Sequence, residues 1–176
     1  GARGGWMLGG EEAFEPAVWL VNVDPSIGQH LSRVAAGLRL KMQLTLDVRC
    51  VPSGAFVVVY CEPSGTTQEV LLQEWLPNIE LSNTIVWVLL ADQASSHWVD
   101  RLLQSGVTDL LVAPTSHRML IHRFRLLLEL WNRRRLESRE RSALSHALHE
   151  REQILASLED GMLLIDTEGS IVDINA

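Results

Sequence analysis

Residues that could carry chemistry are scattered along this 176-residue chain, and none of them has the full spacing of a known site. His146, His149 and Glu150 offer metal ligands from one stretch of predicted helix, but no further ligand is predictable. Residues 63–67, PSGTT, have the small side chains of a phosphate-binding turn without the glycine and lysine pattern of a P-loop. A solvated helix surface explains the first feature and a capped helix start explains the second. We therefore expect no metal site and no cofactor.

Nucleophilic catalysis has no anchor in the sequence either. Ser64, Ser95 and the histidines form no nucleophile-elbow motif, which leaves acyl transfer without a starting point. Cys50 and Cys61 lack CxxC spacing, so a metal site or a disulfide has little support and a reduced, cytoplasmic protein is expected. We therefore expect that this chain is not an enzyme.

Composition and charge narrow the class of protein further. Hydrophobic residues make up 47% of the chain, which is enough to bury one core. The formal net charge of −7 argues against a broad basic surface for nucleic acid. No apolar run approaches the length of about 20 residues that a transmembrane helix needs. The expected partners are therefore proteins, including a second copy of this chain, rather than nucleic acid or membrane.

The elements that must position any site alternate along the chain between strands and helices. Four apolar runs have strand length, and a fifth segment alternates apolar and polar residues like a half-exposed edge strand. Capping signals predict helices after several of them, such as Asp24 with Pro25 and Thr66 with Glu69. This alternation predicts an α/β fold with a five-stranded, mainly parallel, doubly wound sheet. The predicted strands lie at residues 17–23, 44–48, 56–61, 84–91 and 110–113.

One connection between predicted strands is too short for this plan. Parallel neighbours normally need a crossover of about a dozen residues, whereas about seven separate the second predicted strand from the third. Two interpretations stay open. Either one helix is missing and an extended segment crosses between parallel strands, or residues 44–50 and 56–61 form a hairpin.

A long C-terminal helix is predicted to begin near residue 116, because no glycine or proline follows until Gly161. Its apolar stripe nearly vanishes between Asn132 and Ala143 and then resumes. One interpretation is a single helix whose distal part pairs with a second copy as a coiled coil. The other is two helices that break near residue 140 without dimerising. The resumed stripe is formed by Leu144, Leu148, Leu155 and Leu158.

The segment from Gly106 to Trp131 resembles the end of the receiver domains of two-component response regulators, in which a strand finishes in Lys-Pro before the final helix. The resemblance implies a receiver-like (flavodoxin-like) domain over residues 16–131. In that family, two acidic residues after the first strand hold Mg²⁺ and an aspartate ending the third strand accepts phosphate. A hydroxyl residue ends the fourth strand and a lysine the fifth. Aligned strand by strand, the five positions of this phosphoacceptor pocket are degenerate and hold Asn22, Val23, Tyr60, Leu90 and Ala113.

Only two acids lie near enough in the sequence to replace the missing ones. These are Asp24 and Glu62, each one or two residues from a pocket position. Asp24 is better explained as the N-cap of the first helix. Phosphotransfer through the ordinary receiver route is therefore not expected, and a receiver that uses displaced acids remains an alternative.

The last residues of the chain, 153–176, resemble the entrance to a PAS domain. They contain a short helix, the strand GMLLID, the turn TEG and the strand SIVDINA, and glycine in the turn also indicates a hairpin. Together the two resemblances imply a chain cut from a larger protein. Its expected parts are a disordered leader or cloning remnant (1–15), a pseudoreceiver domain (16–131), a signalling helix or coiled-coil linker (132–158) and the truncated start of a PAS domain (159–176).

The resemblances imply a regulatory, protein-interaction module of a multidomain bacterial signal-transduction protein, such as a sensor kinase or a cyclic-di-GMP signalling protein. In receivers, the face formed by the last strand and the helices on either side of it often mediates dimerisation. An alternative of another class is a small-ligand sensor. The residues expected to form protein interfaces are Trp98, Arg101, Leu102, Arg118, His122, Arg125, Trp131, Leu144, Leu148 and Leu155.

Overall fold

The computed structural model describes residues 17–62, 66–91, 96–112, 115–157, 162–165, 167–169 and 171–175, and the statements below concern those residues. By its internal contacts the chain forms two units, which meet in the sequence between Arg134 and Arg135. Each unit is described by itself.

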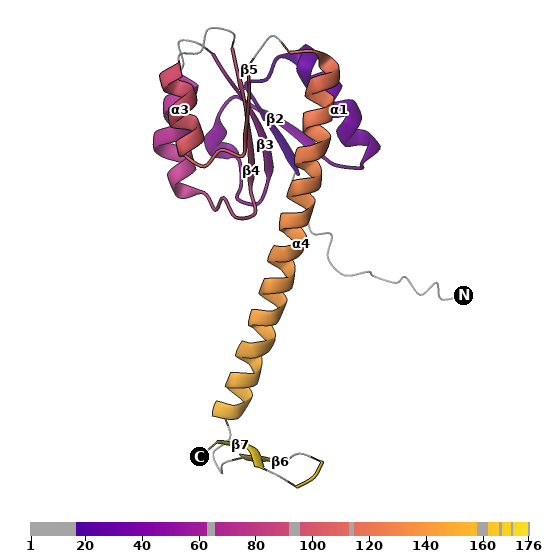
Figure 1. Ribbon diagram of the computed structural model, residues 1–176, viewed down its shortest axis with the longest axis vertical. Helices are drawn as coiled ribbons and strands as arrows, with labels where there is room; N and C mark the ends of the chain where they lie inside the picture. The colour runs from indigo at the N-terminus through magenta and orange to yellow at the C-terminus, as the bar shows by residue number, and fades with distance from the viewer. Residues whose placement is uncertain are drawn as a thin grey trace, which may run out of the picture. The chain divides into compact units, whose positions relative to one another are not determined.

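The first unit is built on a five-stranded parallel sheet, in the order β2-β1-β3-β4-β5 (Figure 1). β3 and β4 consist of continuous apolar residues because both faces of the sheet are covered there. This strand order is that of flavodoxin-like, doubly wound domains, which confirms the predicted fold class. The strands are β1 (Val18–Val21), β2 (Met42–Thr45), β3 (Phe56–Cys61), β4 (Ile85–Leu90) and β5 (Asp109–Val112).

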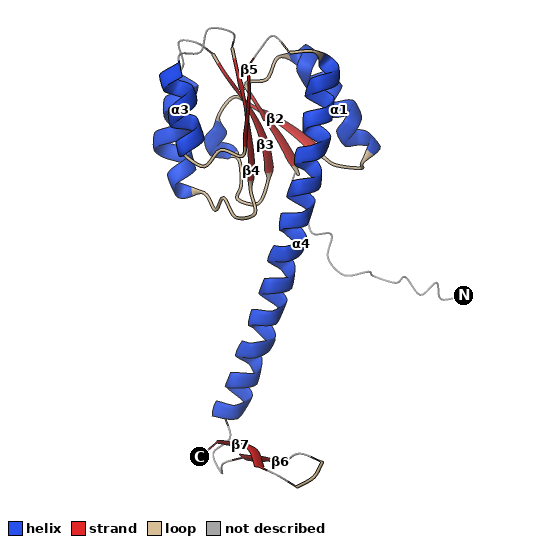
Figure 2. Ribbon diagram, viewed as in Figure 1, coloured by secondary structure: helices blue, strands red, loops and turns tan. Residues whose placement is uncertain are grey.

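Helices cover both faces of this sheet, as Figure 2 shows. α1 (Pro25–Gly37) and the first part of α4 (His117–Ala156) pack on one face, with a core that includes Leu31, Phe56 and Phe124. The other face carries α3 (Ser96–Gln104) and a helical segment that starts as α2 (Thr66–Glu69). That segment continues as a π-helix (Val70–Trp75) and ends in a 3₁₀ turn (Leu76–Asn78). Leu71 and Trp75, four residues apart in the π-helix, are both buried in the core.

The short connection is resolved in favour of a missing helix. β1 pairs in parallel with both β2 and β3, so the hairpin alternative is wrong. β2 ends at Thr45, before the predicted end of the strand, and Val48–Cys50 form a 3₁₀ turn capped by the Asp47 side chain. Val48 is buried because the turn, rather than a strand, directs it into the core. The crossover from β2 to β3 is therefore made without an α-helix.

α4 is one helix of 40 residues, so the predicted alternative of a break near residue 140 is wrong. The Ser116 hydroxyl accepts a hydrogen bond from the Met119 amide and caps its start. Further along, the Trp131 indole donates to the Gly54 carbonyl at 2.9 Å. The Arg134 guanidinium donates to the carbonyls of Leu81 and Thr84 at 3.3 and 3.2 Å. These bonds attach α4 to the loops that precede β3 and β4.

The second unit contains the rest of α4 and an antiparallel pair of strands. β6 (Met162–Ile165) pairs with β7 (Ile171–Asn175), which confirms the predicted hairpin. The predicted transition at residues 158–161 lies outside the described residues. None of the helices in the described ranges combines the length and the apolar character needed to cross a bilayer.

Removal of the Trp131 side chain should destabilise the first unit. Trp131 is only 3% exposed and lies edge-on to Phe56, so Trp131→Ala should lower the free energy of unfolding by about 3–5 kcal/mol. Trp131→Phe should cost about 1–3 kcal/mol, because the Gly54 carbonyl loses its donor. Urea unfolding followed by circular dichroism measures both.

The matched control is Leu136→Ala, because Leu136 lies five residues further along α4 and is 52% exposed. This control should change stability by no more than about 0.5 kcal/mol. Equal losses at the two positions would contradict the role assigned to Trp131.

Candidate functional site

The carboxyl ends of β1, β3 and β4 bring the predicted pocket positions to one edge of the sheet. Val21, the last residue of β1, pairs with Val59 of β3, so the next residues along the two strands, Asn22 and Tyr60, lie beside each other. Tyr60 in turn lies beside Leu89, one residue before Leu90. Ala113 lies outside the described residues. The positions that the structure brings together are Asn22, Val23, Tyr60 and Leu90.

These four side chains offer little to a metal ion or a phosphoryl group. Leu90 is fully buried, and Val23 and Tyr60 are half-buried against the core beneath α1 and α4. Asn22 has a positive φ of 56°, which asparagine tolerates better than most residues. Its backbone N–H donates to the Thr45 carbonyl. Magnesium prefers carboxylate oxygens, and none of the four supplies one. The arrangement suits packing rather than phosphotransfer chemistry.

The two nearby acids are occupied or exposed. The Asp24 carboxylate accepts a hydrogen bond of 2.7 Å from the Ser26 amide, which is the N-cap of α1 that the sequence predicts. Glu62 has an exposed side chain, and its backbone carbonyl accepts a bond from the side-chain amide of Gln68.

The neighbouring Cys61 is a poor nucleophile. Burial raises the pKa of the Cys61 thiol to about 12, so that Cys61 is a neutral thiol.

The histidines proposed and rejected as metal ligands lie on the exposed distal part of α4. His146 contacts Glu150 at 3.4 Å, and His149 contacts Gln153 at 3.0 Å. Within the described ranges, no three His, Cys, Asp or Glu side chains gather closely enough to hold a metal ion.

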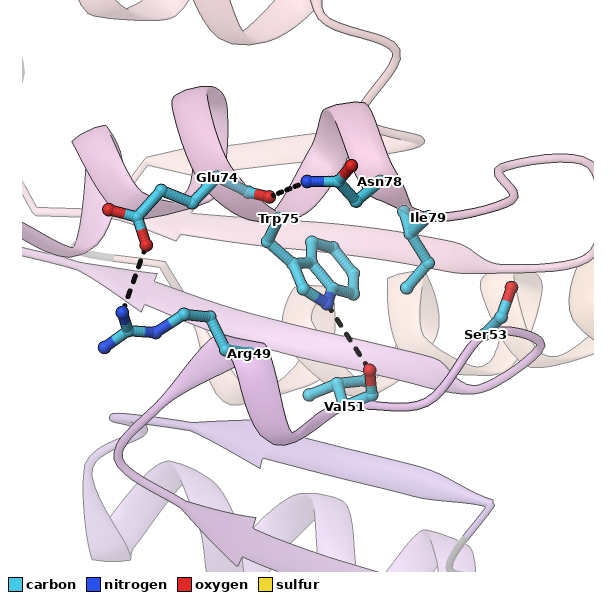
Figure 3. Close-up of a pocket in the computed structure, with 7 residues that line it drawn as sticks. All are labelled: Arg49, Val51, Ser53, Glu74, Trp75, Asn78 and Ile79. Carbon is cyan, nitrogen blue, oxygen red and sulfur yellow. Dashed lines mark hydrogen bonds and ion pairs between the residues drawn. The ribbon is translucent and has the colours of Figure 1, made fainter.

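A hollow of about 270 Å³ lies beside the crossover that lacks a helix (Figure 3). The Trp75 ring forms part of its wall, and the indole donates to the Val51 carbonyl at 3.4 Å. The exposed guanidinium of Arg49 bonds Glu74 at 3.1 Å and Asp47 at 3.0 Å, and these carboxylates raise the pKa of Arg49. The hollow therefore has an apolar wall and, at its rim, the Arg49 and Glu74 side chains, whose charges already pair with each other. The hollow could not be predicted from the sequence, because its lining comes from two separate segments, 49–53 and 74–79.

The residues expected at protein interfaces divide into exposed and buried groups. Arg118, His122 and Arg125 are exposed on α4, and the Arg101 guanidinium stacks over the half-buried ring of Trp98 at 5.0 Å. Two predictions need correction, because Leu102 is fully buried and Trp131 is 3% exposed. Both side chains face the sheet and belong to the core.

The distal residues of that list lie in the second unit. Leu144 and Leu148 are 64% and 53% exposed, and Leu155 is half-buried. The first two therefore present apolar side chains to solvent in this chain.

Sequence reasoning missed a group of exposed apolar residues on α3, β5 and α4. Met119 and Leu126 are seven residues apart, a spacing that places them on one side of α4. That spacing can be read from the sequence, but the same helix has a longer apolar stripe, including Leu120, Phe124 and Leu127, which packs on the sheet and dominates the pattern. The exposed group consists of Leu103, Val112, Met119 and Leu126.

Comparisons with known proteins find structural likeness only. No protein-family model matches the chain, and no curated protein matches it. The fold itself, a five-stranded parallel sheet with the strand order of flavodoxin and CheY and a long C-terminal helix, defines a receiver-type α/β domain.

Three solved structures illustrate the likeness. An adenylate cyclase from Rhodopirellula baltica has a TM-score of 0.51 at 14% identity, over 74% of this chain and 98% of that one. NtrX from Brucella abortus, in complex with ADP, has a TM-score of 0.50 at 13% identity, over 80% of this chain and 34% of that one. A CheY-like response regulator receiver domain protein from Methanospirillum hungatei has a TM-score of 0.46 at 12% identity, over 68% of this chain and 96% of that one. At these identities the likeness concerns the fold.

Substitution of Asp24 distinguishes a helix cap from a catalytic acid. Asp24→Ala should lower stability by about 0.5–2 kcal/mol, whereas Asp24→Asn should keep most of it because an amide oxygen also caps a helix. Thermal unfolding with and without Mg²⁺ measures the effect, and Glu129→Gln, at an exposed acid on α4 that is not a pocket candidate, is the control. A stability gain from Mg²⁺ that disappears in Asp24→Asn would contradict the capping role.

Proposed function

We propose that this chain is a non-catalytic regulatory module of a signal-transduction protein. In this proposal the receiver-type domain binds a partner protein or a second copy. Helix α4 then passes the bound state to a PAS domain that begins near residue 159, and onward to an output domain in a bacterial signalling protein. Two free cysteines in the described part of the chain, Cys50 and Cys61, agree with a reducing, cytoplasmic setting.

One observation carries this proposal: the described pocket positions hold no carboxylate. Phosphorylation of a receiver requires acids that bind Mg²⁺ and accept the phosphoryl group. Leu90 fills the hydroxyl position with a fully buried side chain, and Asp24 is committed to the start of α1. These contacts support the pseudoreceiver interpretation, in which function depends on the surface of the domain.

Two sets of exposed apolar residues support a role in protein binding. The first is Met119 and Leu126 on one side of α4, with Leu103 on α3 and Val112 on β5 also exposed. The second is the distal part of α4, where Leu144 and Leu148 are solvent-exposed. An exposed apolar stripe on a helix is stabilised when a second helix covers it. Self-association through α4 is therefore part of the proposal.

The alternative, a receiver that uses displaced acids, is tested by phosphoryl analogues. The chain should show no change in melting temperature and no change in mass when it is incubated with Mg²⁺ and beryllofluoride, or with Mg²⁺ and acetyl phosphate. The reason is that Leu90 and Val23 supply no ligand. A receiver with an intact acidic pocket, treated in parallel, is the positive control. A mass gain of one phosphoryl group that is lost in Glu62→Gln or Asp24→Asn would establish the alternative.

Pairing of the distal helix is tested by charge. Leu144→Glu with Leu148→Glu should weaken self-association at least about tenfold, because two carboxylates would enter an apolar helix contact. Sedimentation velocity over a concentration series measures the dissociation constant. Ser145→Glu with His149→Glu, one residue further along the same exposed helix, adds the same carboxylates as a control. Equal effects of the two pairs would contradict pairing through this stripe.

A further inference from the structure

The outer edge of β2 is open. β2 is the terminal strand of the sheet, and no described strand pairs with its outer side. The crossover from β2 to β3 holds only the 3₁₀ turn Val48–Cys50. Crossover helices in parallel sheets pack on the faces and leave the edge of a terminal strand without a partner. The strand itself, Met-Gln-Leu-Thr, contains none of the prolines or charges that commonly protect an edge.

The hydrogen-bonding groups at this edge can be assigned. The carbonyls of Lys41 and Thr45 accept bonds from β1, so the backbone of residues 41, 43 and 45 faces inward. Backbone direction alternates along a strand, so the N–H and C=O groups of Met42 and Leu44 face outward. The Leu44 carbonyl accepts a bond of 3.1 Å from the side-chain amide of its own neighbour, Gln43. The outward carbonyl of Leu44 is therefore bonded to the exposed side chain of Gln43.

Exposed apolar side chains accompany these groups. Leu44 is 66% exposed and Leu46 is 86% exposed, and Met42 is half-buried. The other edge of the sheet differs, because β5 carries Asp109 in an ion pair and half-buried leucines. The β2 edge is therefore the side of the sheet on which further strand pairing covers the most apolar surface.

The sequence of this edge is complementary to itself in the antiparallel direction. If Leu44 lies opposite Leu44 of a second copy, Met42 lies opposite Leu46, Gln43 opposite Thr45, and Lys41 opposite Asp47. Apolar residues then meet apolar residues, polar meet polar, and the single cation meets an anion. Leu44 becomes a hydrogen-bonded pair, as its outward backbone groups require. Two-fold pairing is also the commonest symmetry of oligomers.

We propose that this chain self-associates through antiparallel pairing of β2 with β2 of a second copy, which joins two sheets into one. The Lys41–Asp47 contacts at the two ends set the register, since exposed ion pairs add more to specificity than to affinity. The Asp47 carboxylate already accepts hydrogen bonds from the backbone amide and the Nε of Arg49, and its two oxygens have lone pairs for a third donor. The interface lies within the first unit and deepens the proposed function, because it specifies how that unit binds a second copy.

Disulfide trapping tests the predicted register. The test uses the full chain with the exposed Cys50 changed to Ser. In the predicted register, Leu44→Cys places the Cα atoms of the two cysteines about 5.5 Å apart, which is within the range that a disulfide spans. Gln43→Cys is the matched control, because its own copy lies about 7–8 Å away on the diagonal. After mild oxidation, the covalent dimer should form in about tenfold higher yield at position 44 than at position 43. Equal yields, or no dimer at position 44, would overturn the proposal.

Charge reversal tests the same register without cysteines. Lys41→Glu, or Asp47→Lys, sets like charges opposite each other at both ends and should weaken self-association about fivefold, whereas the double variant should restore it. Thermal melts verify folding, because Asp47 caps the following turn. The experiment is repeated with Leu144→Glu and Leu148→Glu, so that helix pairing is removed. Failure of the double variant to recover on that background would overturn edge pairing and leave the proposed function untouched.

Discussion

Attachment of α4 to the sheet is the interaction on which the rest of the structure depends. Phe124 stacks on Trp87 at 6.1 Å and meets Phe56 edge-on at 5.4 Å, and these rings fill the core between α4 and the central strands. About two and three turns beyond Phe124, the bonds of Trp131 and Arg134 satisfy loop carbonyls that the helix would otherwise bury. The contacts fix both the position and the rotation of the helix. Whatever the distal part of α4 does, it starts from a segment that cannot turn without breaking this core.

The crossover from β2 to β3 is made without an α-helix, and a hollow lies beside it at Trp75. Val48 and Val51 from the crossover are buried in the core, so this segment contributes to packing even though it forms only a 3₁₀ turn. The outer edge of β2 is a separate feature, because a crossover helix packs on a face of the sheet and does not pair with an edge strand.

The sequence predicted the strands of the core well, because a run such as Phe56–Cys61 is apolar on both faces and suits few other positions. The described pocket positions lie at one edge of the sheet, since parallel strands end on the same side. The limits of β2 were wrong because Leu44, Leu46 and Val48 alternate as a strand does, and a 3₁₀ turn buries Val48 equally well. Leu102 and Trp131 were misjudged because their helices carry two apolar sides, and periodicity alone does not say which side meets the sheet.

The packing of Leu90 has an energetic consequence for how the domain is switched under the proposed function. Burial of a leucine contributes about 1.5–3 kcal/mol of hydrophobic stabilisation, and the described pocket positions bring together no carboxylates that would repel one another. Leu90 thus favours a single, well-packed state. A shift between two states from about 1:99 to 99:1 needs about 5.5 kcal/mol of differential binding. With no phosphoryl group to supply it under the proposed function, that free energy has to come from contacts at the surface, where a partner or a second copy buries exposed leucines.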